Sequence, residues 1–338
     1  WMQATPGLTN NGTQTYSDTL PRPQISIQSG IYANNLSVTI TSTTPPNIGK
    51  LVYTLNGEDP TINSSTYVGP ISISSNKVLR AKIFPIGNPS ILPSEQAVAT
   101  YLFNIDHTTP ILLVNTPTQN LYGASGIFDN WWTDWVRPAY AILLDTGATH
   151  PLLHQSKTAI RMDGGAGGSR SHPQHSFRLS WAHGTYGEQA LNLGVLPDRP
   201  NRFKYSEFYL RNGSNQYLTL PYKDACQVRM MSEGSANYYS SYRPVSVYIN
   251  GSYFGLYELR EKFNQEYFEQ HDNATRDSIE LLSLSYWYNL ILRAVEGDVD
   301  HFWSDYSLFN DLNPDAPTYW QDADQFFDLK HYTDYIIA

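Results

Sequence analysis

The chain has 338 residues, 41% apolar and 16% charged, with a formal net charge of -9 at pH 7. This length predicts two or three domains. The net negative charge and the absence of a run of basic residues argue against a nucleic-acid partner. No apolar stretch is long enough to span a membrane. The 25 tyrosines and low charge are typical of β-rich extracellular proteins, so we expect a secreted or cell-surface protein.

Residues 1–23 are predicted to be a linker or the end of a preceding domain. Residues 11–23 are rich in Thr, Asn, Ser and Pro, a composition typical of linkers. Residues 1–10, WMQATPGLTN, resemble the closing strand of a lamin-tail domain, a module found in large bacterial surface proteins. The resemblance implies that the chain begins inside a longer protein.

Residues 24–104 are predicted to form an immunoglobulin-like β-sandwich that folds alone. Apolar residues alternate with polar ones in short runs, for example at Leu36, Val38 and Ile40. Turn signals separate these runs, among them Asn56-Gly57 and Asp59-Pro60. Short alternating strands at this spacing are typical of a sandwich.

The same segment resembles the chitobiase C-terminal-type module. The residues that carry the resemblance are YTLNGEDP at 53–60, STYVGPI at 65–71 and LRAK at 79–82. The resemblance implies an accessory module, either a spacer or a module that contacts carbohydrate.

Residues 105–338 are predicted to form an α+β domain. Strands are expected at residues 110–114, 139–144, 158–162, 203–210, 244–249 and 253–259, and helices at 223–231 and 264–271. The last two strands are expected to form a hairpin, because Asn250-Gly251 is a strong signal for a tight turn. The single cysteine, Cys226, has apolar neighbours and is expected to be buried.

Three further segments each allow two interpretations. The loop GGAGGSRS at 164–171 is suited either to cradle a phosphate or to form a flexible turn. The cluster WWTDW at 131–135 is suited to stack on sugar rings or to form a buried aromatic patch. The acidic segments 296–300 and 310–315 are suited to supply oxygen ligands for calcium, or to form a helix cap and a solvated loop.

The region from about residue 108 onwards resembles the CotH kinase family. The matching segments are IRMDGG at 160–165, SRS at 169–171, PQHSFRL at 173–179, YLRNGSN at 209–215 and RPVSVYINGSYFGLYELREK at 243–262. The resemblance implies a protein-kinase-like α+β domain that uses ATP and Mg²⁺ to phosphorylate Ser or Thr of a protein. The expected fold class is therefore mixed β and α+β, a sandwich followed by an incomplete kinase-like domain.

The resemblance also implies a nucleotide site at Arg170, His175, Arg178 and Glu261. Many members of the family have Lys where this chain has His175, and a mostly neutral imidazole cannot replace a fixed charge. We therefore expect this chain to bind ATP weakly or not at all. The alternative function is a non-catalytic surface scaffold or adhesin that uses a kinase-like fold.

In the resembled family a catalytic N-x-D loop and a metal-binding W-D-x-D segment follow the helix that matches residues 328–338, so we expect both to lie outside this chain. No catalytic or metal-binding residue is therefore assigned. Leu329, Tyr332 and Ile336 share one face of a predicted terminal helix. Because such a face needs a partner, we expect residues 108–338 to be part of a larger folding unit.

Overall fold

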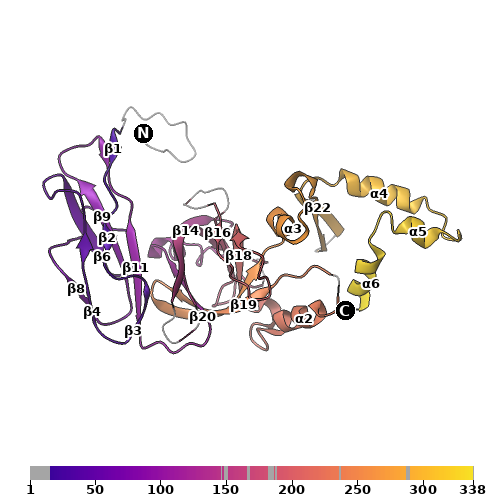
Figure 1. Ribbon diagram of the computed structural model, residues 1–338, viewed down its shortest axis with the longest axis horizontal. Coiled ribbons are helices and arrows are strands. Elements are labelled where there is room, and N and C mark those ends of the chain that lie inside the picture. Colours follow the sequence, from indigo (N-terminus) through magenta and orange to yellow (C-terminus); the bar gives the residue numbers. More distant parts are fainter. Residues whose placement is uncertain are drawn as a thin grey trace.

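The computed structural model describes residues 16–145, 147, 151–165, 168–181, 186, 189–235, 237–286 and 290–337. Along the long axis of the molecule, the chain runs from a β-sandwich through a β-barrel to a helical segment (Figure 1). Residues 1–10, which carry the resemblance to a lamin-tail domain, lie outside the described residues. The mixed β and α+β class is confirmed.

The N-terminal module is a β-sandwich. Its strands are β1 (Asp18–Thr19), β2 (Gln24–Ile25), β3 (Gly30–Tyr32), β4 (Leu36–Val38), β5 (Ile40–Thr41), β6 (Gly49–Thr54), β7 (Ser65–Thr66), β8 (Ile71–Ile73), β9 (Lys77–Pro85), β10 (Ile91–Leu92) and β11 (Ala97–Phe103). The largest sheet has the order β3-β11-β9-β6-β7, and the pairs β4-β8 and β2-β5 form separate ladders. Val38, Ile73, Leu79 and Tyr101 are fully or almost fully buried in one core, as the alternation predicts.

The second module is a closed barrel with the strand order β12-β13-β14-β15-β18-β20-β19. These strands are β12 (Ile111–Asn115), β13 (Val136–Leu144), β14 (Leu152–Met162), β15 (Phe177–Ser180), β18 (Glu207–Arg211), β19 (Tyr242–Ile249) and β20 (Ser252–Glu261). The barrel closes where β12 pairs in parallel with β19. Side chains such as Ile160, Phe177, Phe208 and Leu259 fill its core, because alternate residues of a strand point to the same face.

The turn between β19 and β20 has the predicted chemistry. Asn250 has φ 49° and Gly251 has φ 80°, and positive φ at both central residues defines a type I′ turn. The predicted hairpin is therefore confirmed.

The sandwich packs against the outside of the barrel. Strand β12 is apolar on both faces: Leu112 and Val114 belong to the barrel core, while Ile111 and Leu113 pack with Leu102 of the sandwich. Hydrogen bonds between the modules add to this contact, such as the one from Gln155 Nε2 to the Val98 carbonyl at 2.7 Å. The two modules therefore share a hydrophobic contact.

The remaining elements lie beside and beyond the barrel. They are α1 (Thr118–Leu121), β16 (Leu191–Asn192), β17 (Lys204–Tyr205), η2 (Ser214–Gln216), α2 (Lys223–Ser232), α3 (Gln265–Asp272), η3 (Arg276–Ser278), β21 (Leu281–Tyr286), β22 (Leu290–Glu296), α4 (Asp300–Asn310), α5 (Tyr319–Ala323) and α6 (Leu329–Ile337). Helices α2 and α3 confirm the two predicted helices. Asn264 caps α3 by accepting a hydrogen bond from the Tyr267 N–H at 2.9 Å.

Two surface features of the helices bear on the predictions. The prediction that Cys226 is buried is wrong, because Ala225 is the residue that α2 buries and the next position faces solvent. On α6, Tyr332 and Ile336 are more than half exposed, so their apolar face is not covered within the described chain.

Among the described helices, none is both long and apolar enough to cross a membrane.

Candidate functional site

A cleft of about 420 Å³ lies against the outer wall of the barrel. Strands β18 and β20, helix α2, Ser235, residues 237–240 and Tyr335 of α6 line it, and we call it the α2 cleft. Its volume falls within the range of small-molecule sites. Its walls combine aromatic rings, such as Tyr209 and Phe263, with the charged side chains Arg211, Asp224 and Arg260.

The charged side chains reach the cleft because of the strand register. Arg260 on β20 lies opposite Tyr209 on β18, and Arg211 lies opposite Glu258. The residues between them, Leu210 and Leu259, fill the barrel core. Since successive residues of a strand point to opposite faces, the polar set lies outside the barrel.

The helix and the strands are joined by ion pairs across the cleft wall. Asp224 of α2 lies 2.7 Å from Arg260 Nη1 and 3.2 Å from Arg211 Nη1. Glu258 lies 2.9 Å from Arg260 Nε. The Arg260 side chain is only 3% exposed, and its Nη2 has no hydrogen-bond partner in the described part of the chain. A buried donor without a partner is costly, so an acceptor at this atom would stabilise the arrangement.

Arg170 and His175, two of the residues predicted to contact a nucleotide, are engaged by the protein itself. Arg170 pairs with Asp134 at 2.9 Å. The His175 ring packs 4.7 Å from the Phe128 ring, and its Nδ1 lies 2.5 Å from the Arg170 carbonyl oxygen. Burial lowers the pKa of His175, so the ring is neutral near pH 7 and donates from Nδ1.

The other two predicted residues, Arg178 and Glu261, are also paired. Arg178 on β15 lies 3.2 Å from Glu207, which also contacts Lys262. Glu261, fully buried at the end of β20, lies 2.7 Å from Arg202 and 3.2 Å from Arg199. Burial raises the pKa of Glu261, and the two arginines oppose that shift. Of the four predicted residues, Glu261 is the one that lines the α2 cleft.

The described part of the glycine-rich loop forms a series of turns. The N–H groups of Gly168, Ser171 and Ser176 donate to carbonyls of the loop itself. Gly164 has φ 91°, and a Cβ there would lie 1.9 Å from Ser169 Oγ, so this position requires glycine. Residues 166 and 167 lie outside the described residues. The described N–H groups support the turn interpretation of this loop.

The tryptophan cluster divides between core and surface. Trp131 packs against the barrel core, as predicted for a buried aromatic patch. Trp132 is 57% exposed and Trp135 is 38% exposed, so these two do not belong to a buried patch. Residues 131–135 form turns and irregular backbone before β13, without the regular alternation of a strand. Arg137 covers Trp135, with its guanidinium carbon 5.0 Å from the centre of the ring.

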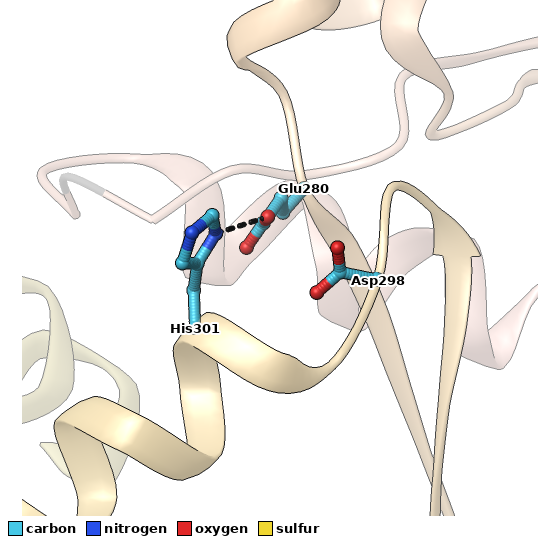
Figure 2. A group of neighbouring side chains, drawn as sticks. All are labelled: Glu280, Asp298 and His301. Carbon is cyan, nitrogen blue, oxygen red and sulfur yellow. Dashed lines mark hydrogen bonds and ion pairs between the residues drawn. The ribbon is translucent and has the colours of Figure 1, made fainter.

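One group of side chains in the described residues has the composition of a metal site. Glu280, Asp298 and His301 point toward one another near the start of α4, and their ligand atoms lie within 4.8 Å (Figure 2). All three are exposed. His301 Nδ1 lies 2.6 Å from Glu280, whose hydrogen bond raises the pKa of that imidazole. The Asp298 side chain accepts a hydrogen bond from the Asp300 N–H at 2.8 Å, and this bond orders the first turn of α4.

Asp163, next to the glycine-rich loop, gives a testable pH dependence. Burial raises its pKa from 3.8 to about 6, although nearby arginines, first of all Arg161, oppose the shift. The folded state therefore binds this proton more tightly than the unfolded state. We expect the contribution of Asp163 to stability to fall by about 3 kcal/mol as the pH rises from about 4 to about 6.

The measurement is urea unfolding at several pH values for the wild type and for Asp163→Asn. The variant keeps the shape of the side chain and removes its titration. We expect a flatter pH profile for the variant over that interval. Identical profiles for both proteins would contradict the assignment.

The arginines of the α2 cleft were not predicted as site residues. Two signals in the sequence point to them. Glu258, Arg260 and Lys262 stand at every second position, and this period of two indicates one charged face of a strand. Asp224 is the second residue of the predicted helix at 223–231. The pairing between them depends on β18, β20 and α2 meeting in space.

The structure defines a two-module, β-rich protein in which a barrel carries a polar cleft against a helix. The family pattern described as CotH kinase protein matches residues 160–338, more than half of the chain, and the chain belongs to this family. Residues 27–92 match the chitobiase/beta-hexosaminidase C-terminal domain. A search of curated proteins finds no match.

Proposed function

We propose that the α2 cleft binds the nucleotide of a CotH-type protein kinase, whose activity transfers phosphate from ATP to Ser or Thr of a protein. The ion pair between Asp224 of α2 and Arg260 of β20, at 2.7 Å, carries this proposal. Protein kinases position ATP phosphates with a cation on a strand, which a carboxylate on a neighbouring helix holds in place. Here Arg260 has the role of the cation and Asp224 that of the carboxylate.

The residues present fit a phosphate group better than a metal ion. Arg260 Nη2 has no hydrogen-bond partner among the described atoms, and Arg211 is partly exposed beside it. Both arginines can donate to phosphate oxygens, while Tyr209 and Phe263 offer ring surfaces to a base. The carboxylates of Asp224 and Glu258 are paired with arginines, so we assign no residue to Mg²⁺.

Binding of ATP to this chain is expected to be weak, in the millimolar range. The arginines that would hold phosphate are already neutralised by Asp224 and Glu258. Line broadening of ATP in phosphorus NMR measures such binding. Arg211→Met should weaken binding about tenfold, a loss of about 1.4 kcal/mol.

Arg260→Met should have a larger effect on ATP binding, but it also removes a buried ion pair. Arg211→Met is the variant that avoids this risk, because the Arg211 side chain is 34% exposed. Arg137→Met is the matched control, since Arg137 stacks on Trp135. The proposal fails if the wild type leaves the ATP spectrum unchanged, or if Arg211→Met binds as well as the wild type.

A second candidate function is a non-catalytic surface scaffold or adhesin. It is supported by the contacts of Arg170, His175 and Arg178, which all bind groups of the protein itself. An absence of ATP binding would favour this function. Both candidates include a secreted or surface location, for which the support is the low charge and high tyrosine content; cell fractionation tests it.

A further inference from the structure

A second pocket, of about 470 Å³, lies between the sandwich and the barrel, and we call it the intermodule pocket. Arg80 and Lys82 of β9 alternate on one face of the sandwich and form one wall, together with the segment 94–96. Tyr140 of β13 and Lys157 of β14 lie opposite each other in the barrel register and form the other wall. The pocket therefore exists only because the two modules are docked.

Ionic and aromatic contacts hold the two walls together. Lys157 of the barrel pairs with Glu95 of the sandwich. Arg80 lies 2.5 Å from Asp59, and its guanidinium carbon lies 5.5 Å from the centre of the Tyr140 ring. A pocket with such fixed walls is already formed before a ligand binds, which lowers the entropic cost of binding.

The two walls of the pocket together offer both hydrogen-bond donors and hydrogen-bond acceptors. Lys82 and Lys157 donate, while Asp59 and Glu95 accept. Arg80 is 2% exposed, and its Nε and Nη2 have no hydrogen-bond partner among the described residues. Apolar surface comes from Pro117, Pro138, Ala139 and the Tyr140 ring.

This combination selects one class of ligand. A phosphate or another polyanion would meet the carboxylates of Asp59 and Glu95 beside the cations, so we expect the pocket to bind it weakly. A sugar hydroxyl both donates and accepts, and the C–H face of a sugar ring matches an apolar surface beside the polar groups. The two carboxylates and the three cations leave little net charge, which favours a neutral ligand.

We propose that the intermodule pocket binds a neutral oligosaccharide, with Lys82 of the sandwich and Lys157 of the barrel both contacting its hydroxyls. This site is separate from the α2 cleft. Because both modules contribute to it, the bound sugar also stabilises the docked arrangement of the modules.

The test uses the full chain and two neutral probes, a β-linked glucose tetramer and an N-acetylglucosamine tetramer. Saturation-transfer NMR and thermal unfolding with each sugar measure binding, because a ligand of the folded state raises its stability. We expect at least one tetramer to bind. Lys82→Ala and Lys157→Ala should each weaken that binding about tenfold, a loss of about 1.4 kcal/mol.

Lys77→Ala is the matched control, since Lys77 is an exposed lysine of the same strand β9 that does not line the pocket. It should bind the sugar as the wild type does. Binding of neither tetramer, binding that survives both Lys82→Ala and Lys157→Ala, or binding of inorganic phosphate instead would overturn the proposal. Arg211→Met should leave sugar binding unchanged, which separates this test from that of the nucleotide cleft.

Discussion

Replacing Glu261 by alanine is expected to lower the free energy of unfolding by about 3–5 kcal/mol. The Glu261 side chain is fully buried and pairs with Arg202 at 2.7 Å and Arg199 at 3.2 Å. It also accepts the Ser241 N–H at 2.8 Å. Its removal would leave two largely buried guanidinium groups without their counter-charge, and that is the costly way to break a buried ion pair.

Urea unfolding followed by tryptophan fluorescence measures this loss. Glu261→Gln separates charge from shape, and we expect it to lose most of the same stability. Lys330→Ala, which breaks an exposed pair with Asp334 on α6, is the control and should cost at most about 0.5 kcal/mol. A loss below about 1 kcal/mol for Glu261→Ala would show that this ion-pair cluster is not a stabilising centre.

Replacing Leu102 by alanine is expected to destabilise the barrel as well as the sandwich, by about 2–5 kcal/mol. Leu102 belongs to strand β11 of the sandwich and is fully buried in the cluster that contains Ile111, Leu113 and Ile142 of the barrel. Removing the side-chain atoms leaves a cavity between the modules. The loss of stability therefore includes both the lost burial of apolar surface and the cost of the cavity.

Tryptophan fluorescence gives a direct readout of this coupling. Residues 24–104 contain no tryptophan, so the signal reports on other parts of the chain. We expect Leu102→Ala to lower the urea midpoint of that signal. Val68→Ala, at a position of the sandwich that is 94% exposed, should change stability by less than about 0.5 kcal/mol. An unchanged fluorescence midpoint for Leu102→Ala would mean that the modules unfold independently.

The same contact bears on whether residues 24–104 fold alone, which stays a prediction. The strands have their own core around Val38, Leu79 and Tyr101, and this favours independent folding. Separation from the barrel would nevertheless expose Leu102 and part of Ile31. We expect the isolated sandwich to keep its β-structure with a lower stability.

The sequence by itself determined the local elements. Asn250-Gly251 specified the hairpin, because both residues tolerate positive φ. The alternation in residues 24–104 specified strands with one buried face, and Asn264 marked the start of α3 through its capping hydrogen bond. These features depend on interactions within a few residues, so sequence patterns predict them well.

The tertiary structure alone decided how these elements combine. The apolar run in β12 predicts a strand, but the parallel pairing with β19 that closes the barrel joins residues more than a hundred positions apart. The exposure of Cys226 depends on which side of α2 faces the barrel wall. The cations of the α2 cleft and the walls of the intermodule pocket are likewise set by long-range contacts, Asp224 with Arg260 and Arg80 with Tyr140. Such pairings depend on packing between whole elements, and no local sequence pattern encodes which partners meet.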